Sequence, residues 1–176
     1  QDGTLLALYR SRWADFIHAS RSTDGRNWTA PEPTALPNNN SSIQARVLAN
    51  GHVALAYNHS SAANATERRA SLYDDLGEDM AVEVPTTGRS AFWGAPRAPL
   101  TLAISDDDGL TWPWQRNLET GDGYCMSNNS EQRLNREYSY PSIRQSADGA
   151  LHLAYTVFRQ HIRHARVMPD WVKQGA

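Results

Sequence analysis

The sequence has little that would support a membrane, disulfide-stabilised or nucleic-acid-binding function. A single cysteine, Cys125, excludes a disulfide within the chain. The longest apolar stretches, 53–57 and 100–104, fall far short of the about 20 residues that span a bilayer. Basic residues (17) and acidic residues (19) nearly balance, so no charge excess indicates a nucleic acid partner. No metal-ligand cluster, phosphate loop or nucleotide fingerprint occurs, and we expect no cofactor.

The beginning of the chain also lacks the features of a secreted precursor. No basic-then-apolar leader precedes the first strand, and Gln1 opens inside a repeated pattern, so we expect a fragment of a longer protein. Asn-x-Ser/Thr acceptors are nevertheless frequent, which favours a secreted or extracellular location. They begin at Asn27, Asn39, Asn40, Asn58, Asn64 and Asn128.

What the sequence does contain is an internal repeat. Segments 2–10, 50–58 and 148–156 each open with Asp-Gly or Asn-Gly and continue as a strand with a tyrosine six residues after the glycine. These dipeptides accept the positive φ angles of a two-residue hairpin turn. Strand side chains alternate between faces, so each tyrosine shares a face with an apolar residue near the strand start. The pairs are Leu5 and Tyr9, Val53 and Tyr57, and Leu151 and Tyr155.

The spacing of the repeats predicts a β-propeller. Gly3 and Gly51 are 48 residues apart, which suits one propeller blade. Gly51 and Gly149 are 98 residues apart, so we interpret that blade as enlarged by inserted loops at 59–96 and 115–136. A single blade leaves an apolar face uncovered. We therefore predict an all-β partial propeller over 1–176, about three blades of a six-bladed ring, with the remaining blades supplied by missing sequence or another chain.

A second motif is more specific. Residues 105–112 fit the Asp-box pattern Ser-x-Asp-x-Gly-x-Thr-Trp at every fixed position, and 22–28 form the same motif one residue shorter. The serine and aspartate can bond the turn's own amides, and the tryptophan can pack between sheets. The box is a folding device, so Asp24 and Asp107 are not expected to act as acids. Boxes and repeats together resemble the sialidase (neuraminidase) superfamily, in its divergent BNR-repeat branch, over nearly the whole chain.

This resemblance implies carbohydrate chemistry. In sialidases three arginines bind the substrate carboxylate, a tyrosine attacks the anomeric carbon, a glutamate accepts the tyrosine proton and an aspartate is the general acid. Guanidinium groups match a carboxylate, and a phenol with a pKa of about 10 needs a neighbouring base. Carried over to this sequence, Arg97 before the second box resembles a substrate-binding arginine. Tyr138, in a Tyr-Ser pair before the third repeat, resembles the nucleophile.

The sequence departs from the family pattern in two places. The arginine of the preceding blade is replaced by Asn58, and the catalytic glutamate would lie near Ser42 or Gln44, neither of which is acidic. An ordinary sialidase mechanism therefore needs substitutes from the inserted loop, such as Glu67 or Arg68.

Three further residues complete the predicted site. Arg10 has the position of Asn58 on another blade, and Trp93 offers an aromatic face to a sugar ring. His59, at a strand end, is the candidate acid or base near neutral pH. Arg10, Asn58, Trp93 and Arg97 are thus the predicted binding residues, and Tyr138, His59 and Glu67 the predicted catalytic ones.

Three functions fit these observations. The first is a sialidase-like glycoside hydrolase acting on an acidic glycan. The second is a rhamnose–glucuronate lyase or a rhamnosidase of a related propeller branch, since a lyase needs an arginine and a histidine or tyrosine base but no paired carboxylates. The third is a propeller that binds glycans without reacting with them.

Overall fold

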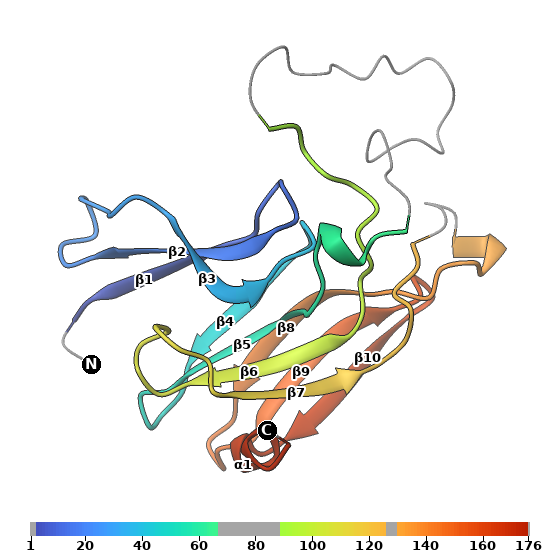
Figure 1. Cartoon of the computed structure of the whole chain (residues 1–176). Coiled ribbons are helices and arrows are strands. Elements are labelled where there is room, and N and C mark those ends of the chain that lie inside the picture. Colours follow the sequence, from blue (N-terminus) through green and yellow to red (C-terminus); the bar gives the residue numbers. More distant parts are fainter. Residues whose placement is uncertain (1–2, 67–88, 126–129, 176) are drawn as a thin grey trace.

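The computed structural model describes residues 3–66, 89–125 and 130–175 (Figure 1). The described part is almost entirely β-structure, with three antiparallel sheets that follow one another along the chain. The first sheet contains β1 (Leu5–Tyr9), β2 (Phe16–Ser22) and β3 (Glu32–Pro37). The second contains β4 (Gln44–Val47), β5 (Val53–Asn58), β6 (Leu100–Ser105) and β7 (Trp114–Glu119). The third contains β8 (Tyr138–Gln145), β9 (Leu151–Val157) and β10 (His161–Val167).

The helical elements are short. They are the 3₁₀ turns η1 (Ala62–Asn64) and η2 (Ser130–Gln132) and the helix α1 (Pro169–Lys173), which packs beside β6 and β7. In the residues that the structure describes, no helix is long and apolar enough to cross a membrane. The all-β prediction with three blade-like sheets is confirmed, but β7 occupies the first residues of the loop expected at 115–136.

The three glycines of the repeat have equivalent conformations. Gly3, Gly51 and Gly149 have φ angles of 90°, 85° and 84°. Gly51 lies in the turn between β4 and β5, and Gly149 in the turn between β8 and β9. These values lie in the region that glycine enters without the penalty of a Cβ atom. The three repeats in the sequence therefore share the backbone conformation of their glycine.

The second sheet forms the centre of the described structure because both of its faces are covered. Every residue of β5 and β6 is buried. On one face, Leu100, Leu102 and Ile104 join a core with the third sheet. On the other face, Leu55 and Ala103 join a smaller core with the first sheet. This alternation follows from the two-residue period of a strand and explains why both strands are mostly apolar along their whole length.

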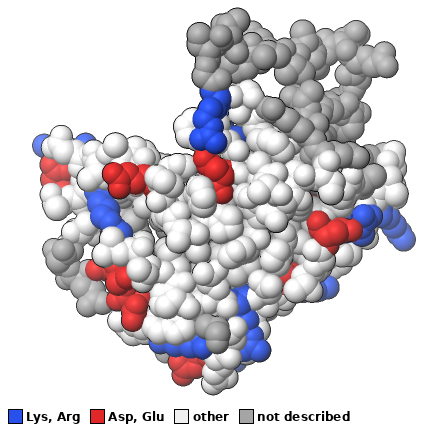
Figure 2. Space-filling view, in the orientation of Figure 1, with Lys and Arg blue, Asp and Glu red and all other residues white. Residues whose placement is uncertain are grey.

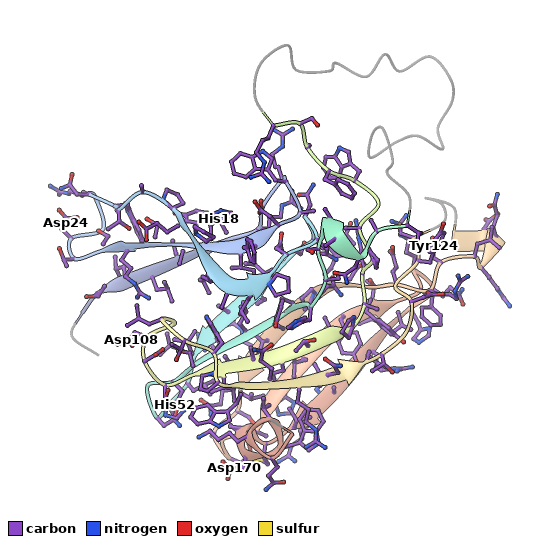
Figure 3. The ribbon with its side chains drawn as sticks, in the orientation of Figure 1. His18, Asp24, His52, Asp108, Tyr124 and Asp170 are labelled. Atoms are coloured by element: carbon purple, nitrogen blue, oxygen red, sulfur yellow. The ribbon has the colours of Figure 1, made fainter. Side chains whose placement is uncertain are left out.

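The complete Asp box folds as expected. Ser105 Oγ donates to Asp107 Oδ1 at 2.7 Å and accepts from the Gly109 amide at 2.8 Å. Asp107 also accepts from the amide and the hydroxyl of Thr111. Trp112 is buried against the first sheet. Figure 3 places Asp24 and Asp108, one from each box, at hairpin ends on the same side of the molecule.

The shorter box differs in its tryptophan. Trp28 is 42% exposed, although its Nε1 donates to the Gly25 carbonyl at 3.3 Å. The expectation that both tryptophans pack between sheets is therefore correct for Trp112 and wrong for Trp28. Trp112 lies between the first and second sheets, whereas no described sheet packs against the outer side of the Trp28 hairpin.

Replacing Trp112 with alanine should lower the free energy of unfolding by about 3 kcal/mol, because the change empties a buried site between two sheets. Chemical denaturation of the parent and the variant measures this difference. The matched control is Trp28→Ala, for which we expect a loss of less than about 1 kcal/mol, since exposed sites change stability little. Equal losses for the two variants would contradict the difference in burial.

The Asp107 carboxylate should make stability depend on acid pH. Burial acts to raise its pKa, but hydrogen bonds from Thr111 and Ser105 outweigh burial and lower the pKa from 3.8 to about 2. The contribution of the ionised Asp107 carboxylate to the free energy of unfolding is therefore complete above about pH 4, and it is lost as the pH falls toward 2. Asp107→Asn should cost about 1 kcal/mol at neutral pH, solvent screening included. Thermal melting of both proteins should show this gap closing as the pH approaches 2; a gap independent of pH would contradict the assignment.

Candidate functional site

Glu137, the residue before β8, is a fully buried carboxylate placed between two arginines. Arg159 Nε donates to Glu137 Oε1 at 2.6 Å, and Arg97 Nη1 lies 3.9 Å from the same oxygen. Ser139 links the group, because its hydroxyl accepts from Arg97 Nη1 at 3.1 Å and donates to Glu137 Oε1 at 3.3 Å. A buried carboxylate requires such partners. Two guanidinium groups and one carboxylate leave a formal charge of +1, which suits an anionic ligand.

The two arginines line one small cavity, called here the arginine cavity. Its volume is about 20 Å³, which holds about one water-sized group. It is therefore large enough for a single oxygen atom but not for a sugar ring. The lining residues come from the segments between β3 and β4, β5 and β6, β7 and β8, and β9 and β10. They are Asn39, Asn40, Trp93, Gly94, Ala95, Arg97, Cys125 and Arg159.

Tyr140 lies above this group of charges. The register between β8 and β9 shifts between Ser139 and Ser142, and Tyr140 sits in the shifted stretch with a φ of 53°. A bulge of this kind re-aims a side chain. The Tyr140 side chain is 61% exposed, and the Arg97 guanidinium carbon lies 5.8 Å from its ring centroid. Tyr140 is thus a solvent-accessible phenol beside the arginine cavity.

Unusual backbone conformations gather at the cavity. Asn40, Tyr140 and Arg159 have φ angles of 64°, 53° and 56°. Left-handed conformations cost free energy for residues with side chains, most of all for bulky ones, and such residues cluster at functional sites. Here the conformation lets Arg159, in the turn after β9, reach Glu137.

Asparagine side chains hold the loop that carries Trp93 and Arg97. Asn39 Nδ2 donates to the Pro96 carbonyl at 2.6 Å, and Asn40 Nδ2 donates to the Phe92 carbonyl at 3.1 Å. Both asparagines are buried, as is Asn58. Their amides are therefore not accessible to glycosylation, and the prediction of a secreted protein rests on the other acceptors.

Cys125 lines the cavity as a thiol. Burial, followed by the neighbouring Glu137 carboxylate, raises its pKa to about 11. The thiolate is the reactive form of cysteine, so the raised pKa disfavours Cys125 as a nucleophile.

The structure places the predicted residue Tyr138 in the apolar core. Its hydroxyl donates to the Thr120 carbonyl at 3.1 Å, and its ring meets the Tyr155 ring edge-on at 6.5 Å. Burial raises its pKa. Tyr138 does not line the arginine cavity. Its backbone carbonyl accepts from Asn58 Nδ2 at 3.1 Å, so buried Asn58 ties β5 to β8 rather than facing the cavity.

His59 is also away from the arginines. It lines a separate pocket with Gln115 and Asn117 on the second sheet. Its Nδ1 lies 2.7 Å from the Tyr57 hydroxyl, which donates to Gln115 Oε1 at 2.9 Å. Desolvation lowers the pKa of His59. The structure thus does not bring His59 together with Arg97.

Of the other predicted residues, Trp93 and Arg97 line the cavity together. Arg10 is adjacent, since its Nη1 donates to the Asn40 carbonyl at 3.5 Å. Glu67 and Arg68 lie outside the described residues.

Sequence reasoning missed Glu137, Tyr140 and Arg159. Two signals were available: Glu137 directly precedes the Tyr-Ser pair, and Tyr140 is a second tyrosine two residues after the first. Arg159 has no comparable signal, because it lies in a hairpin turn without glycine.

Comparisons with known proteins agree with this architecture. A structure described as "Hadza microbial sialidase Hz136" aligns with 97% of this chain at 17% identity and a TM-score of 0.56. The alignment covers 26% of that protein, so the chain spans about a quarter of its length. A protein of unknown function from Dyadobacter fermentans DSM 18053 aligns at 12% identity over 96% of this chain and 63% of its own, with a TM-score of 0.41, which is too low to indicate a shared fold. No curated protein matches this sequence.

The family comparison covers most of the chain. The profile of the BNR repeat-like domain matches residues 1–153, which include both Asp boxes and all three glycine turns. The sialidase alignment shows the fold alone, at its low identity, and that fold is the sialidase-like β-propeller expected from the repeats. The chain therefore belongs to the BNR repeat-like domain family.

Proposed function

We propose that this chain supplies the carboxylate-binding part of a sialidase-like glycoside hydrolase site that acts on an acidic glycan. One observation carries the proposal: Arg97 and Arg159 converge on buried Glu137 at a cavity that also contains Trp93. The side chains of both arginines are only 15% and 19% exposed, so their charges act in a partly desolvated environment. An ionised sugar acid would gain more there than a neutral sugar.

Each residue would have a distinct role. Glu137 fixes the two guanidinium groups, and their outer N–H groups bind the sugar carboxylate. Trp93 supplies an aromatic surface for the ring. Tyr140, rather than Tyr138, would be the nucleophile, because the Tyr140 phenol is exposed beside Arg97 while the Tyr138 hydroxyl is engaged by the Thr120 carbonyl. The base that accepts the phenol proton would come from the rest of the protein, since the chain spans about a quarter of the sialidase with which it aligns.

A uronate lyase is the second candidate. Among the described residues no acidic side chain lines the arginine cavity, and Glu137, which contacts its two arginines, is held by Arg159. A lyase would use Arg97 and Arg159 to neutralise the uronate and Tyr140 as the base, with no second carboxylate. The lack of a carboxylate among the described lining residues is the observation that makes the lyase the second candidate.

Two assays on the full-length protein separate these functions. Release of a fluorophore from a sialic acid glycoside supports the hydrolase. An increase in ultraviolet absorbance from an unsaturated uronate supports the lyase. If both assays are silent while an array of acidic glycans still retains the protein, the chain is part of a binding propeller. The proposal fails if neutral glycans give the same result as acidic glycans in both assays and on the array.

A further inference from the structure

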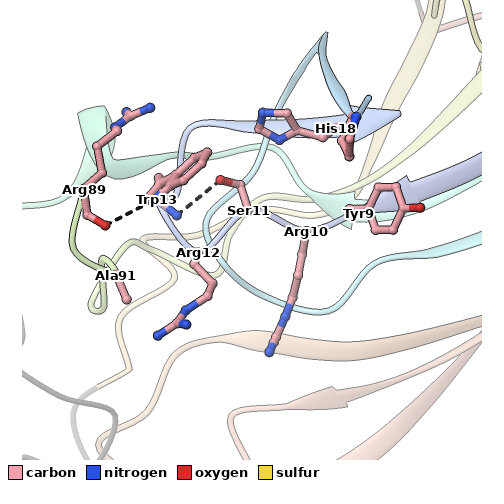
Figure 4. Close-up of a pocket in the computed structure, with 9 residues that line it drawn as sticks. Tyr9, Arg10, Ser11, Arg12, Trp13, His18, Arg89 and Ala91 are labelled. Carbon is pink, nitrogen blue, oxygen red and sulfur yellow. Dashed lines mark hydrogen bonds between the residues drawn. The ribbon is translucent and has the colours of Figure 1, made fainter. Parts of the chain in front are cut away.

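A larger pocket lies on the first sheet, next to the arginine cavity, and we call it the first-sheet pocket (Figure 4). It has a volume of about 620 Å³, within the range of about 300–1,000 Å³ that is usual for small-molecule sites. The segment after β1 forms one side of it with Arg10, Arg12 and Trp13, and Arg89 and Ala91 form the other.

The charge of the first-sheet pocket is positive. Three arginines line it and no acidic side chain does. Arg89 forms an ion pair with Asp15, which does not line the pocket; the distance from Arg89 Nη1 to Asp15 Oδ2 is 3.3 Å. Arg12 is exposed and has no acidic partner among the described residues, and Figure 4 shows its side chain extending on the same side as Arg10. The overall charge of the chain is −2, and Figure 2 shows scattered charges of both signs without a continuous patch on the face in view. The local excess is therefore a feature of this pocket.

Aromatic side chains provide the apolar part of the pocket. Tyr9 and Trp13 are each 42% exposed. Trp13 is held in place on two sides, because its Nε1 donates to the Arg89 carbonyl at 3.3 Å and the Arg89 guanidinium carbon lies 5.0 Å from its ring centroid. Exposed aromatic rings beside cationic groups match a sugar that has an apolar face and an acidic substituent.

The two pockets share a wall. The Phe92 amide donates to the Arg12 carbonyl at 2.7 Å, and the Phe92 carbonyl accepts from Asn40 Nδ2 at 3.1 Å. Residues on either side of Phe92 line the two pockets, with Ala91 in the first-sheet pocket and Trp93 in the arginine cavity. Arg10 also connects them, since it lines the first-sheet pocket and contacts Asn40. One ligand chain can therefore reach both.

From this arrangement we infer that the first-sheet pocket is a second subsite, which binds the next acidic sugar of the glycan held by the arginine cavity. The inference rests on the proposed function and narrows it: the preferred ligand has at least two adjacent sugars, each with a carboxylate. Arg12 supplies the main charge for the second carboxylate, and Tyr9 and Trp13 contact the second ring.

The test uses the indole N–H signals of Trp13 and Trp93 in nuclear magnetic resonance spectra of the full-length protein, assigned with Trp13→Phe and Trp93→Phe. The ligands are sialic acid, glucuronic acid and the disaccharide of each. We expect monosaccharides to shift the Trp93 signal and a disaccharide to shift both. We also expect one disaccharide to bind about tenfold more tightly than its monosaccharide, as one added charged hydrogen bond allows.

Two variants locate the effect. Arg12→Gln should remove the tenfold preference for the disaccharide and leave monosaccharide binding unchanged. Arg26→Gln, at an exposed arginine of the shorter Asp box that lines neither pocket, should change nothing. A shift of Trp93 alone with every ligand, or an unchanged preference in Arg12→Gln, would overturn the second subsite and leave the proposed function intact. A shift of Trp13 without Trp93 would support this pocket and contradict the arginine cavity, and no shift of either signal would overturn both.

Discussion

Arg97→Ala should reduce turnover of an acidic glycoside, or affinity for the glycan if the protein only binds, by about a hundredfold without unfolding the protein. The Arg97 guanidinium lies near the buried Glu137 carboxylate and borders the arginine cavity, so its removal takes away a charged donor that an anionic ligand would use. A charged hydrogen bond contributes about 1.5–3 kcal/mol, and the upper part of that range corresponds to this factor. Steady-state kinetics and binding titration of the full-length protein measure it.

Two controls separate charge from shape. Arg97→Lys keeps the charge but loses the planar pair of donors, so we expect it to recover only part of the activity. Arg144→Ala changes an exposed arginine of β8 that does not line the cavity, and it should behave like the parent protein. Unchanged turnover and affinity in Arg97→Ala would remove Arg97 from the site.

Glu137→Ala should lower the free energy of unfolding by about 4 kcal/mol. Removing one partner of a buried ion pair leaves the other charges without compensation, which costs about 3–5 kcal/mol. Here the side chain of Glu137 has no solvent exposure, and Arg159 would lose its 2.6 Å contact. Chemical denaturation measures the change, and Glu137→Gln should lose less because the amide oxygen still accepts from Arg159.

A double-mutant cycle tests whether the loss arises from this pair. Glu137→Ala combined with Arg159→Ala should be less destabilising than the sum of the single changes, since neither partner then remains unpaired. A loss below about 1 kcal/mol for Glu137→Ala would show that the carboxylate is not the structural centre of the site.

The sequence was a good guide to the fold because its signals are local. An Asn-Gly or Asp-Gly pair specifies a turn through the φ angle of its glycine, and Gly3, Gly51 and Gly149 do have nearly the same φ. The complete Asp box likewise makes its hydrogen bonds within eight residues, from Ser105 to Trp112. Trp28 shows the limit of this reasoning, because the burial of a side chain depends on which sheet packs against it.

The site was harder to predict because its geometry depends on irregular backbone. Strict alternation along β8 puts Tyr138 and Tyr140 on one face, but the shift between Ser139 and Ser142 sends Tyr138 into the core and leaves Tyr140 exposed. Arg159 reaches Glu137 from a turn in which it adopts a positive φ, and no residue pattern signals such a turn without glycine. By contrast, Arg97 was predicted from its place before the Asp box and Trp93 from its place in the inserted loop, and both line the arginine cavity.

The most direct test of the carboxylate site is a crystal structure of the full-length protein with sialic acid and, separately, with glucuronic acid. The arrangement of Arg97 and Arg159 predicts that one of these acids places its carboxylate within hydrogen-bond distance of both guanidinium groups, about 3 Å, with the ring beside Trp93 and Tyr140. A sugar acid bound with its carboxylate directed away from both arginines, or bound only elsewhere on the protein, would contradict it.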